Sequence, residues 1–350
     1  MKLNFLFLLL GLVLCSYACK KEGTIEFIYG CSYDEVSKKA IKQKEPYCIV
    51  LIDSTDNKDN KYISLLGNYL KTSRNIICNI IDVNTVEGQW LFKSLSPQIL
   101  PTTCVFNQES SFVDIIPGSA KESLLYTQLA IDEETTTNFH LPNRFNLQKS
   151  KLIPLIEIVL ATKVNLEYGI YDNTSLDKCI NLLDYPYPLY LKMIGMQIEK
   201  DSVEMRSIAN MICNNISDFD LEIFKEEYIT AKKILNPYFE TEDEANIEIV
   251  EGGLNNIEGY VGENIPFEVQ VRNIGMKPLK ISNIKTSCDC VWYIGNRNIT
   301  IQPHEKTILK FIFHGERENE YVRDIFITSN AINIPFLNIK VSVNLKNNAI

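Results

Sequence analysis

Hydrophobic residues in the first third of the chain form two continuous runs of strand length, at 47–53 and 75–82. Such runs are typical of strands that crossing helices bury on both faces. Between them, apolar side chains recur at helical spacing at Tyr62, Leu65, Leu66 and Tyr69. The pattern predicts a strand, a helix and a second, parallel strand joined by a right-handed crossover.

A hairpin is predicted to follow. A helical pattern near 89–95 precedes two apolar runs at 100–106 and 111–116, and a short polar turn separates these runs. Two strands joined in this way pair antiparallel. We therefore expect residues 22–129 to form one α/β domain.

The segment at 132–237 has helical patterns and no strand signal. Helices are predicted at 151–168, with Pro154 in the first turn, at 175–183, near 189–198 and near 205–212. The clearest pattern spaces apolar residues alternately three and four apart, at Leu221, Phe224, Tyr228, Ala231 and Leu235. It predicts a single helix with one apolar face that ends before Pro237.

The last third is predicted to be all-β. An acidic stretch at 240–244 predicts a linker at 238–245. Strand-like runs follow at 247–250, 267–271, 279–284, 307–313, 322–328 and 336–343. Several short strands at intervals of about ten residues are typical of an immunoglobulin-like sandwich, which we expect at 246–350.

The N-terminus has the pattern of an export signal. Met1 and Lys2 give a positive start, residues 3–14 are apolar, and small residues precede Cys19. The apolar run is shorter than the roughly 20 residues that span a bilayer, which predicts a signal peptide at 1–18. The segment resembles the lipobox of bacterial lipoproteins, which implies lipid attachment at Cys19. Cys15 is the poorer candidate because Leu14, not a small residue, precedes it.

These features predict an exported, lipid-anchored protein of the cell envelope. Lys20 directly after Cys19 resembles a signal for transfer to an outer membrane. The charged residues 20–22 also resemble a surface-export signal of the Bacteroides type. We therefore expect the outer membrane, at its periplasmic or its surface face.

Composition narrows the range of partners. The 350 residues are 45% hydrophobic and 23% charged, which are globular values for two or three domains. The formal charge of -9 and the lack of a long basic stripe argue against nucleic acid as a partner. The sequence therefore favours the membrane, and a peptide or protein, as partners.

Ten cysteines could bind metal or form disulfides, but their spacing gives little support to either. Besides Cys15 and Cys19, eight cysteines lack the regular spacing of a small stapled fold, so we expect most to be buried thiols. Cys179 and Cys213 have no histidine at ligand spacing. We expect no metal and no cofactor.

The element order of the first domain resembles the thioredoxin fold. By this resemblance Pro101 is the candidate cis-proline and Gly118 the glycine after the hairpin. A redox-active member would carry Cys-x-x-Cys between the first central strand and its helix. Here the stretch at 53–61 has no cysteine, and Asn57 and Asn60 are expected at the two thiol positions. The resemblance implies a scaffold for binding, without catalytic residues.

The last domain resembles the bacterial family of unknown function 1573. The resemblance rests on 267–275, on 277–281, on the Ser287-Cys288-Asp289-Cys290 stretch, on 301–303 and on 327–330. Asp289 and Val291 stand where the family usually has Gly and Thr, and His304 replaces a usual Gly. The family implies an immunoglobulin-type module and no known activity.

Cys288 and Cys290 leave three alternatives. They could form a disulfide across one residue, or bind copper or zinc with His304 or His314, or pack as paired thiols on one strand face. Alternate residues of a strand point the same way, which favours the paired thiols.

The sequence therefore favours a non-catalytic, lipid-anchored envelope protein that binds a peptide or protein partner. One alternative is a divergent thiol-disulfide oxidoreductase that uses Cys288 and Cys290 or the cysteines of the first domain. The second alternative is a structural spacer. The absence of the redox-active Cys-x-x-Cys argues against enzymatic activity but does not decide the question.

Overall fold

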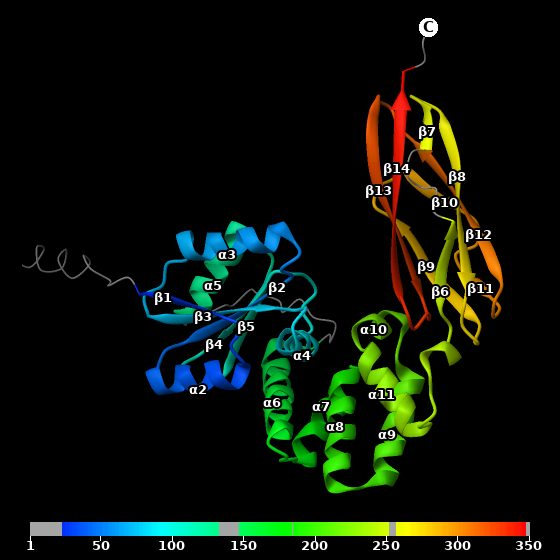
Figure 1. Ribbon diagram of the computed structural model, residues 1–350. Helices are drawn as coiled ribbons and strands as arrows, with labels where there is room; N and C mark the ends of the chain where they lie inside the picture. The colour runs from blue at the N-terminus through cyan, green and yellow to red at the C-terminus, as the bar shows by residue number, and fades with distance from the viewer. Residues whose placement is uncertain (1–22, 133–146, 184, 252–256, 348–350) are drawn as a thin grey trace, which may run out of the picture. The chain divides into compact units, whose positions relative to one another are not determined.

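A computed structural model describes residues 23–132, 147–183, 185–251 and 257–347 (Figure 1). The chain divides into two compact units, 1–191 and 192–350. The boundary falls inside the predicted helical segment 132–237. The signal peptide and Cys19 lie outside the described residues.

A five-stranded mixed sheet forms the centre of the first unit, in the order β1-β3-β2-β4-β5. Its strands are β1 (Ile25–Tyr29), β2 (Tyr47–Ile52), β3 (Ile76–Asp82), β4 (Thr102–Phe106) and β5 (Phe112–Pro117). β1, β3 and β2 are parallel, and β4 and β5 form the predicted antiparallel hairpin. This order confirms the thioredoxin-like fold.

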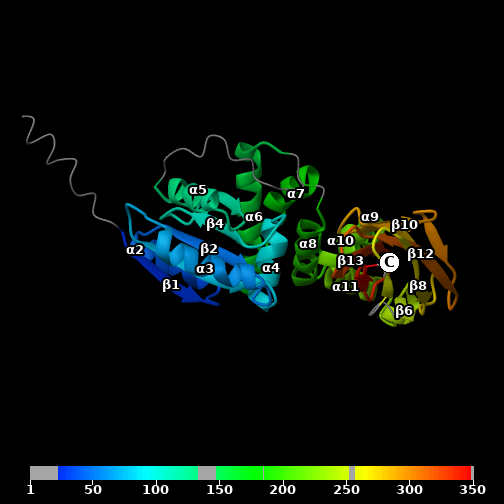
Figure 2. The same ribbon diagram turned by 90° about the horizontal axis from the view of Figure 1, so that it is seen from above.

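Four helices cover the two faces of this sheet: α2 (Tyr33–Gln43), α3 (Asn57–Tyr69), α4 (Val86–Leu95) and α5 (Lys121–Ile131). α3 and α5 lie on one face and α2 on the other (Figures 1 and 2). Apolar residues of β2 and β3, such as Val50 and Ile80, pack against Tyr62 and Leu66 of α3 and Leu124 of α5. The continuous apolar runs of the sequence are therefore the buried strands of this core.

Two further helices, α6 (Lys149–Glu167) and α7 (Asn173–Leu182), belong to the first unit. The backbone N–H of Phe112 on β5 donates to Glu157 on α6 at 2.8 Å, which joins α6 to the edge strand of the sheet. Pro154 lies inside α6 and not in its first turn as predicted, because the helix begins at Lys149. α8 (Pro186–Glu199) contains the boundary between the two units.

The helices of the second unit are α9 (Ser202–Asn215), α10 (Asp218–Ile223) and α11 (Lys225–Leu235). The prediction of one helix through Leu221 and Leu235 is wrong. Phe224 takes φ -110° and ψ 29°, outside the helical region, and separates α10 from α11. The predicted apolar face is nevertheless buried at Leu221, Phe224, Tyr228 and Ala231.

Two sheets form the sandwich of the second unit, and all their paired strands are antiparallel except β14 and β7. One has the order β10-β12-β8-β6 and the other β11-β9-β13-β14-β7 (Figure 1). The strands are β6 (Ile247–Glu251), β7 (Ile257–Tyr260), β8 (Asn264–Asn273), β9 (Leu279–Thr286), β10 (Val291–Ile294), β11 (Ile299–Ile301), β12 (Lys306–His314), β13 (Asn319–Ser329) and β14 (Phe336–Lys346). Alternate residues of β8, β12 and β14 are buried and build one core. The predicted sandwich is confirmed.

The predicted acidic linker at 238–245 is packed in the structure. Thr241–Asp243 form a short 3₁₀ helix, and Phe239, Glu244 and Ala245 are buried. Glu244 forms ion pairs with Lys232 of α11 at 3.1 Å and with Lys277 of the sandwich at 2.8 Å. This segment therefore joins α11 to the sandwich.

Within the described ranges, every helix is too short or too polar to cross a lipid bilayer.

Candidate functional site

The N-terminus of α3 is the place where a thioredoxin-like dithiol would lie. Asn57 is the first residue of α3 and follows the N-cap Asp56. Both asparagines are exposed, and Asn60 donates from Nδ2 to the carbonyl of Ser54 at 3.2 Å. Because no cysteine occurs between Cys48 and Cys78, the helix N-terminus presents no thiol.

Hydrogen bonds order the loop that precedes α3. Asp53 accepts from the Thr55 backbone at 2.9 Å and from Asn84 Nδ2 at 3.0 Å. The hydrogen bonds from Thr55, and then that from Asn84, lower the pKa of Asp53. Asp59 is buried one turn into α3 and accepts from the Asp53 backbone at 2.7 Å, and its burial raises its pKa. The loop therefore has a defined conformation.

Pro101 lies beside this loop. The Leu100–Pro101 peptide bond is cis, and the register of the sheet pairs Thr102 with Leu51. The segment before β4 consequently lies next to the residues that follow β2. Pro101 is buried, whereas the side chain of Ile99 is 53% exposed. We call Asn57, Lys58 and Ile99 to Pro101 the loop face.

The sheet cysteines are buried thiols. Cys48 and Cys78 are paired residues of β2 and β3, with their sulfurs 3.4 Å apart. The hydrogen bond from Cys48 and burial raise the pKa of Cys78, and burial raises that of Cys104. Burial also raises the pKa of Cys179 to about 12. Such thiols are poor nucleophiles.

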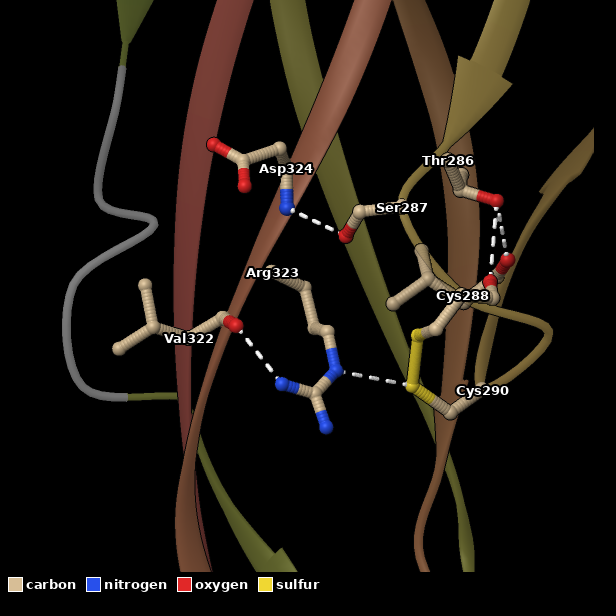
Figure 3. The surroundings of a disulfide bond; sticks show 8 residues. Thr286, Ser287, Cys288, Cys290, Val322, Arg323 and Asp324 are labelled. Atoms are coloured by element: carbon tan, nitrogen blue, oxygen red, sulfur yellow. Dashed lines mark hydrogen bonds between the residues drawn. A yellow bond between two sulfur atoms is a disulfide. The ribbon is translucent and has the colours of Figure 1, made fainter. Parts of the chain in front are cut away.

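Cys288 and Cys290 form a disulfide with an S–S distance of 2.00 Å (Figure 3). The preferred alternative of paired free thiols on a strand is therefore wrong. The two cysteines lie in the turn after β9 and not in a strand, and this turn brings their Cα atoms to 5.2 Å. The metal alternative also fails, because the disulfide removes both thiolates.

A copper or zinc site at Cys288 and Cys290 would need His304 or His314 as a further ligand. His314 Nδ1 lies 3.1 Å from Asn264 Oδ1, and its backbone N–H donates to the carbonyl of Cys290 at 2.9 Å. No group of three or more His, Cys, Asp or Glu side chains in the described residues could hold a metal ion.

Arg323 of β13 contacts this disulfide. Its Nε donates to Cys290 Sγ at 3.1 Å, and its Nη1 donates to the carbonyl of Val322 at 2.8 Å (Figure 3). The guanidinium also lies 5.1 Å from the centre of the Tyr321 ring. Sequence reasoning missed Arg323, because it lies 33 positions after Cys290 and belongs to no recognised motif.

The described residues line surface cavities in both units. One, of about 570 Å³, borders the disulfide turn and is lined in part by Thr286, Asp289 and Trp292. Another, of about 430 Å³, lies between α3 and α5 and is lined by Leu65, Tyr69, Lys121, Leu124, Leu125 and Gln128. The first is polar at its rim and the second is mainly apolar.

Comparison with known proteins finds a family for the last part of the chain. Residues 254–343 match the family described as protein of unknown function (DUF1573). This part of the chain is therefore a DUF1573 domain. No curated protein sequence matches the chain.

Three solved structures are similar to parts of the chain. A protein of unknown function from Porphyromonas gingivalis W83 is 21% identical over 31% of this chain and 51% of its own, with a TM-score of 0.26. Thioredoxin f from spinach chloroplast (short form) is 21% identical over 31% of this chain and 95% of its own, with a TM-score of 0.25. The ASH/PapD-like domain 7 of human CEP192 is 11% identical over 32% of this chain and 93% of its own, with a TM-score of 0.26.

Proposed function

We propose that this protein is a lipid-anchored, non-catalytic protein of the cell envelope that binds an extended segment of a peptide or protein partner at the loop face. The observation that supports the proposal is the position of the segment before β4, with its cis Pro101, next to the cysteine-free loop that leads from β2 to α3. The first unit has the scaffold of a thioredoxin and lacks its reactive group.

The loop face has the groups that an extended peptide needs. Ile99 offers an exposed apolar side chain, and burying such a side chain contributes about 1.5–3 kcal/mol when it becomes fully covered. The Asn57 amide can donate to and accept from a peptide backbone. The ordered loop at 53–56 lowers the entropy that binding would cost.

Thiol chemistry in the first unit has little support. Cys48, Cys78 and Cys104 have no exposed surface, and Cys31 has a pKa raised by burial and by its hydrogen bond to Glu35. A thiolate, and not a thiol, is the attacking species in disulfide exchange. Binding is therefore favoured over catalysis at this unit.

Attachment through Cys19 would restrict the partner to the envelope. Two acyl chains hold a protein stably at a membrane, whereas a single chain binds only marginally. We infer that the partner lies at the outer membrane, at its periplasmic or surface side.

The test uses two exposed isoleucines as a matched pair. Ile99 on the loop face is 53% exposed and Ile41 on α2, on the opposite side of the sheet, is 51% exposed. A soluble form without residues 1–18 and with Cys19→Ser is used to capture partners from envelope extract. We expect Ile99→Asp to reduce capture about tenfold and Ile41→Asp to leave it unchanged, since one buried apolar side chain is worth this much.

Equal capture by both variants would contradict binding at the loop face. Capture of no protein by the unsubstituted form would favour the structural spacer. Dithiol-dependent reduction of insulin by a variant with Cys288→Ser and Cys290→Ser, at a rate comparable with that of an active thioredoxin, would overturn the non-catalytic assignment of the first unit.

A further inference from the structure

The disulfide turn after β9 has a positive charge directly against one of its two sulfurs. Arg323 Nε lies 3.1 Å from Cys290 Sγ, and no hydrogen bond joins the guanidinium to Cys288 among the described residues (Figure 3). The two sulfurs of the disulfide therefore differ in their surroundings.

Arg323 is held in place from several sides. Its Nη1 donates to the carbonyl of Val322, and its guanidinium packs on the ring of Tyr321. Tyr321 in turn donates from its hydroxyl to the carbonyl of Arg317 at 2.9 Å and packs on Phe313 with ring centres 5.2 Å apart. The guanidinium is thus positioned before any reaction takes place.

Within the described ranges, no carboxylate pairs with the charge of Arg323. The side chain is half-buried. A half-buried cation without a counter-ion is costly, and a thiolate at Cys290 would supply the missing negative charge.

We propose that the Cys288–Cys290 disulfide is a thiol-exchange site in which Cys290 is the leaving sulfur and Arg323 stabilises its thiolate. The thiolate of a dithiol donor attacks Cys288 Sγ. The Cys288–Cys290 bond breaks, a mixed disulfide forms between the donor and Cys288, and the electron pair passes to Cys290 Sγ beside the guanidinium.

A second exchange completes the reaction. The other thiolate of the donor attacks the donor's own sulfur in the mixed disulfide and forms the donor disulfide. Cys288 leaves as a thiolate and takes a proton from water. The donor is oxidised by two electrons, and the Cys288–Cys290 pair is reduced by two.

The site is open on the side of the turn. Asp289, the residue between the two cysteines, is exposed and lines the cavity of about 570 Å³. Cys288 and Cys290 are themselves half-buried. The proposal requires a donor thiol to approach Cys288 at this turn, where the disulfide packs on the edge of the sandwich core.

The test measures reduction by dithiothreitol, a dithiol, in the soluble form described above. Reduction is followed by alkylation and mass spectrometry of the peptide that contains both cysteines. We expect Arg323→Gln to slow reduction about tenfold, because a hydrogen bond to a charged group is lost from the leaving thiolate. Arg323→Lys, which keeps the charge, should recover part of the rate.

A second measurement identifies the leaving sulfur. In the reduced protein, a limiting amount of alkylating reagent should label Cys290 before Cys288, and Arg323→Gln should remove this preference. Arg272→Gln, at an exposed arginine of β8, serves as the control and should leave both results unchanged.

Three results would overturn the proposal. The first is equal rates of reduction for the unsubstituted and Arg323→Gln proteins, with circular dichroism showing both to be folded. The second is faster labelling of Cys288. The third is a disulfide that becomes reducible only when the sandwich unfolds. None of these depends on whether the loop face binds a partner.

Discussion

The hydroxyl of Tyr62 lies within the core of the first unit, where it forms a 2.9 Å hydrogen bond with Thr103 Oγ1. Burial raises the pKa of Tyr62 to about 12. Tyr62→Phe leaves the Thr103 hydroxyl without this partner, so we expect it to lower the free energy of unfolding by about 1–2 kcal/mol. Trp90 fluorescence during urea unfolding, in a Trp292→Phe background, measures the change.

Thr103→Val removes the other half of this hydrogen bond and is combined with Tyr62→Phe in a double variant. The double variant should cost less than the sum of the two single changes, because both halves of one hydrogen bond are removed together. Strict additivity of the two effects would show that the contact contributes nothing.

At the scale of single residues, the sequence predicted which side chains are candidates for chemistry. It did not predict the residues that contact them. Asn57 and Asn60 could be recognised because the thioredoxin fold has its two thiols at a fixed place, before and in the first turn of a helix, and this chain has no cysteine there. Arg323 could not, because its importance depends on the pairing of β13 with β9, which brings Asp324 next to Ser287 through their backbone and side-chain atoms. Contacts between residues so far apart in the chain follow from strand register and not from a local pattern.

Asn273 at the end of β8 connects several elements of the sandwich. Its Nδ2 donates to the carbonyls of Lys277 at 2.7 Å and Ile301 at 3.0 Å, and its Oδ1 accepts from the backbone of Gly275 at 3.0 Å. The side chain is fully buried. Asn273→Ala leaves these backbone groups without a partner, and we expect it to destabilise the sandwich by about 3 kcal/mol or more.

The measurement uses the fluorescence of Trp292 during chemical unfolding, in a Trp90→Phe background. Asn344→Ala, at an exposed position of β14, is the control and should change the free energy of unfolding by less than about 0.5 kcal/mol. A similar loss in both variants would mean that the hydrogen bonds of Asn273 are not important for stability.

At the scale of elements, the length of a strand decided whether it could be predicted within the sandwich. The long runs that became β8, β12, β13 and β14 were recognised from their composition. β7, β10 and β11 have only four, four and three residues, too few for an alternating pattern to stand out. The helix break at Phe224 was missed because the apolar spacing continues through it.

The uncertain position of strand ends explains why the sequence favoured paired thiols over the Cys288–Cys290 disulfide. Cys-x-Cys on a strand places two side chains on one face, but Cys-x-Cys in a turn brings two sulfurs together. The end of β9 at Thr286 decides between these arrangements. Strand ends are uncertain by a few residues when only one sequence is known.

For the whole molecule, the order of elements was sufficient to predict the fold class. One core contains residues of β2, β3, α3 and α5, and a separate core lies between the two sheets of the sandwich. The sequence did not predict that the helical segment divides between the two units. Its helices have similar apolar faces, so composition alone cannot assign them to one core or the other.

The proposed anchor determines where the whole molecule is found in a cell. We expect Cys19→Ser to shift the protein from the membrane fraction to the soluble fraction, because both acyl chains would be lost. Cys15→Ser should leave the protein at the membrane. Cell fractionation and metabolic labelling with a fatty acid measure the two variants side by side, and retention of the Cys19→Ser protein with its label would contradict attachment at this residue.

The packed segment at 238–245 affects where a truncated form of the DUF1573 domain can begin. The family match begins at residue 254, after β6, which is paired with β8. Ile332 of the sandwich shares a small core with Tyr228 of α11 and Phe239. A truncated protein that starts at 254 would expose the edge of β8 and this core, and exposed edges of this kind promote aggregation. Such a truncation therefore needs to keep α11 and the segment at 238–245 together with the sandwich.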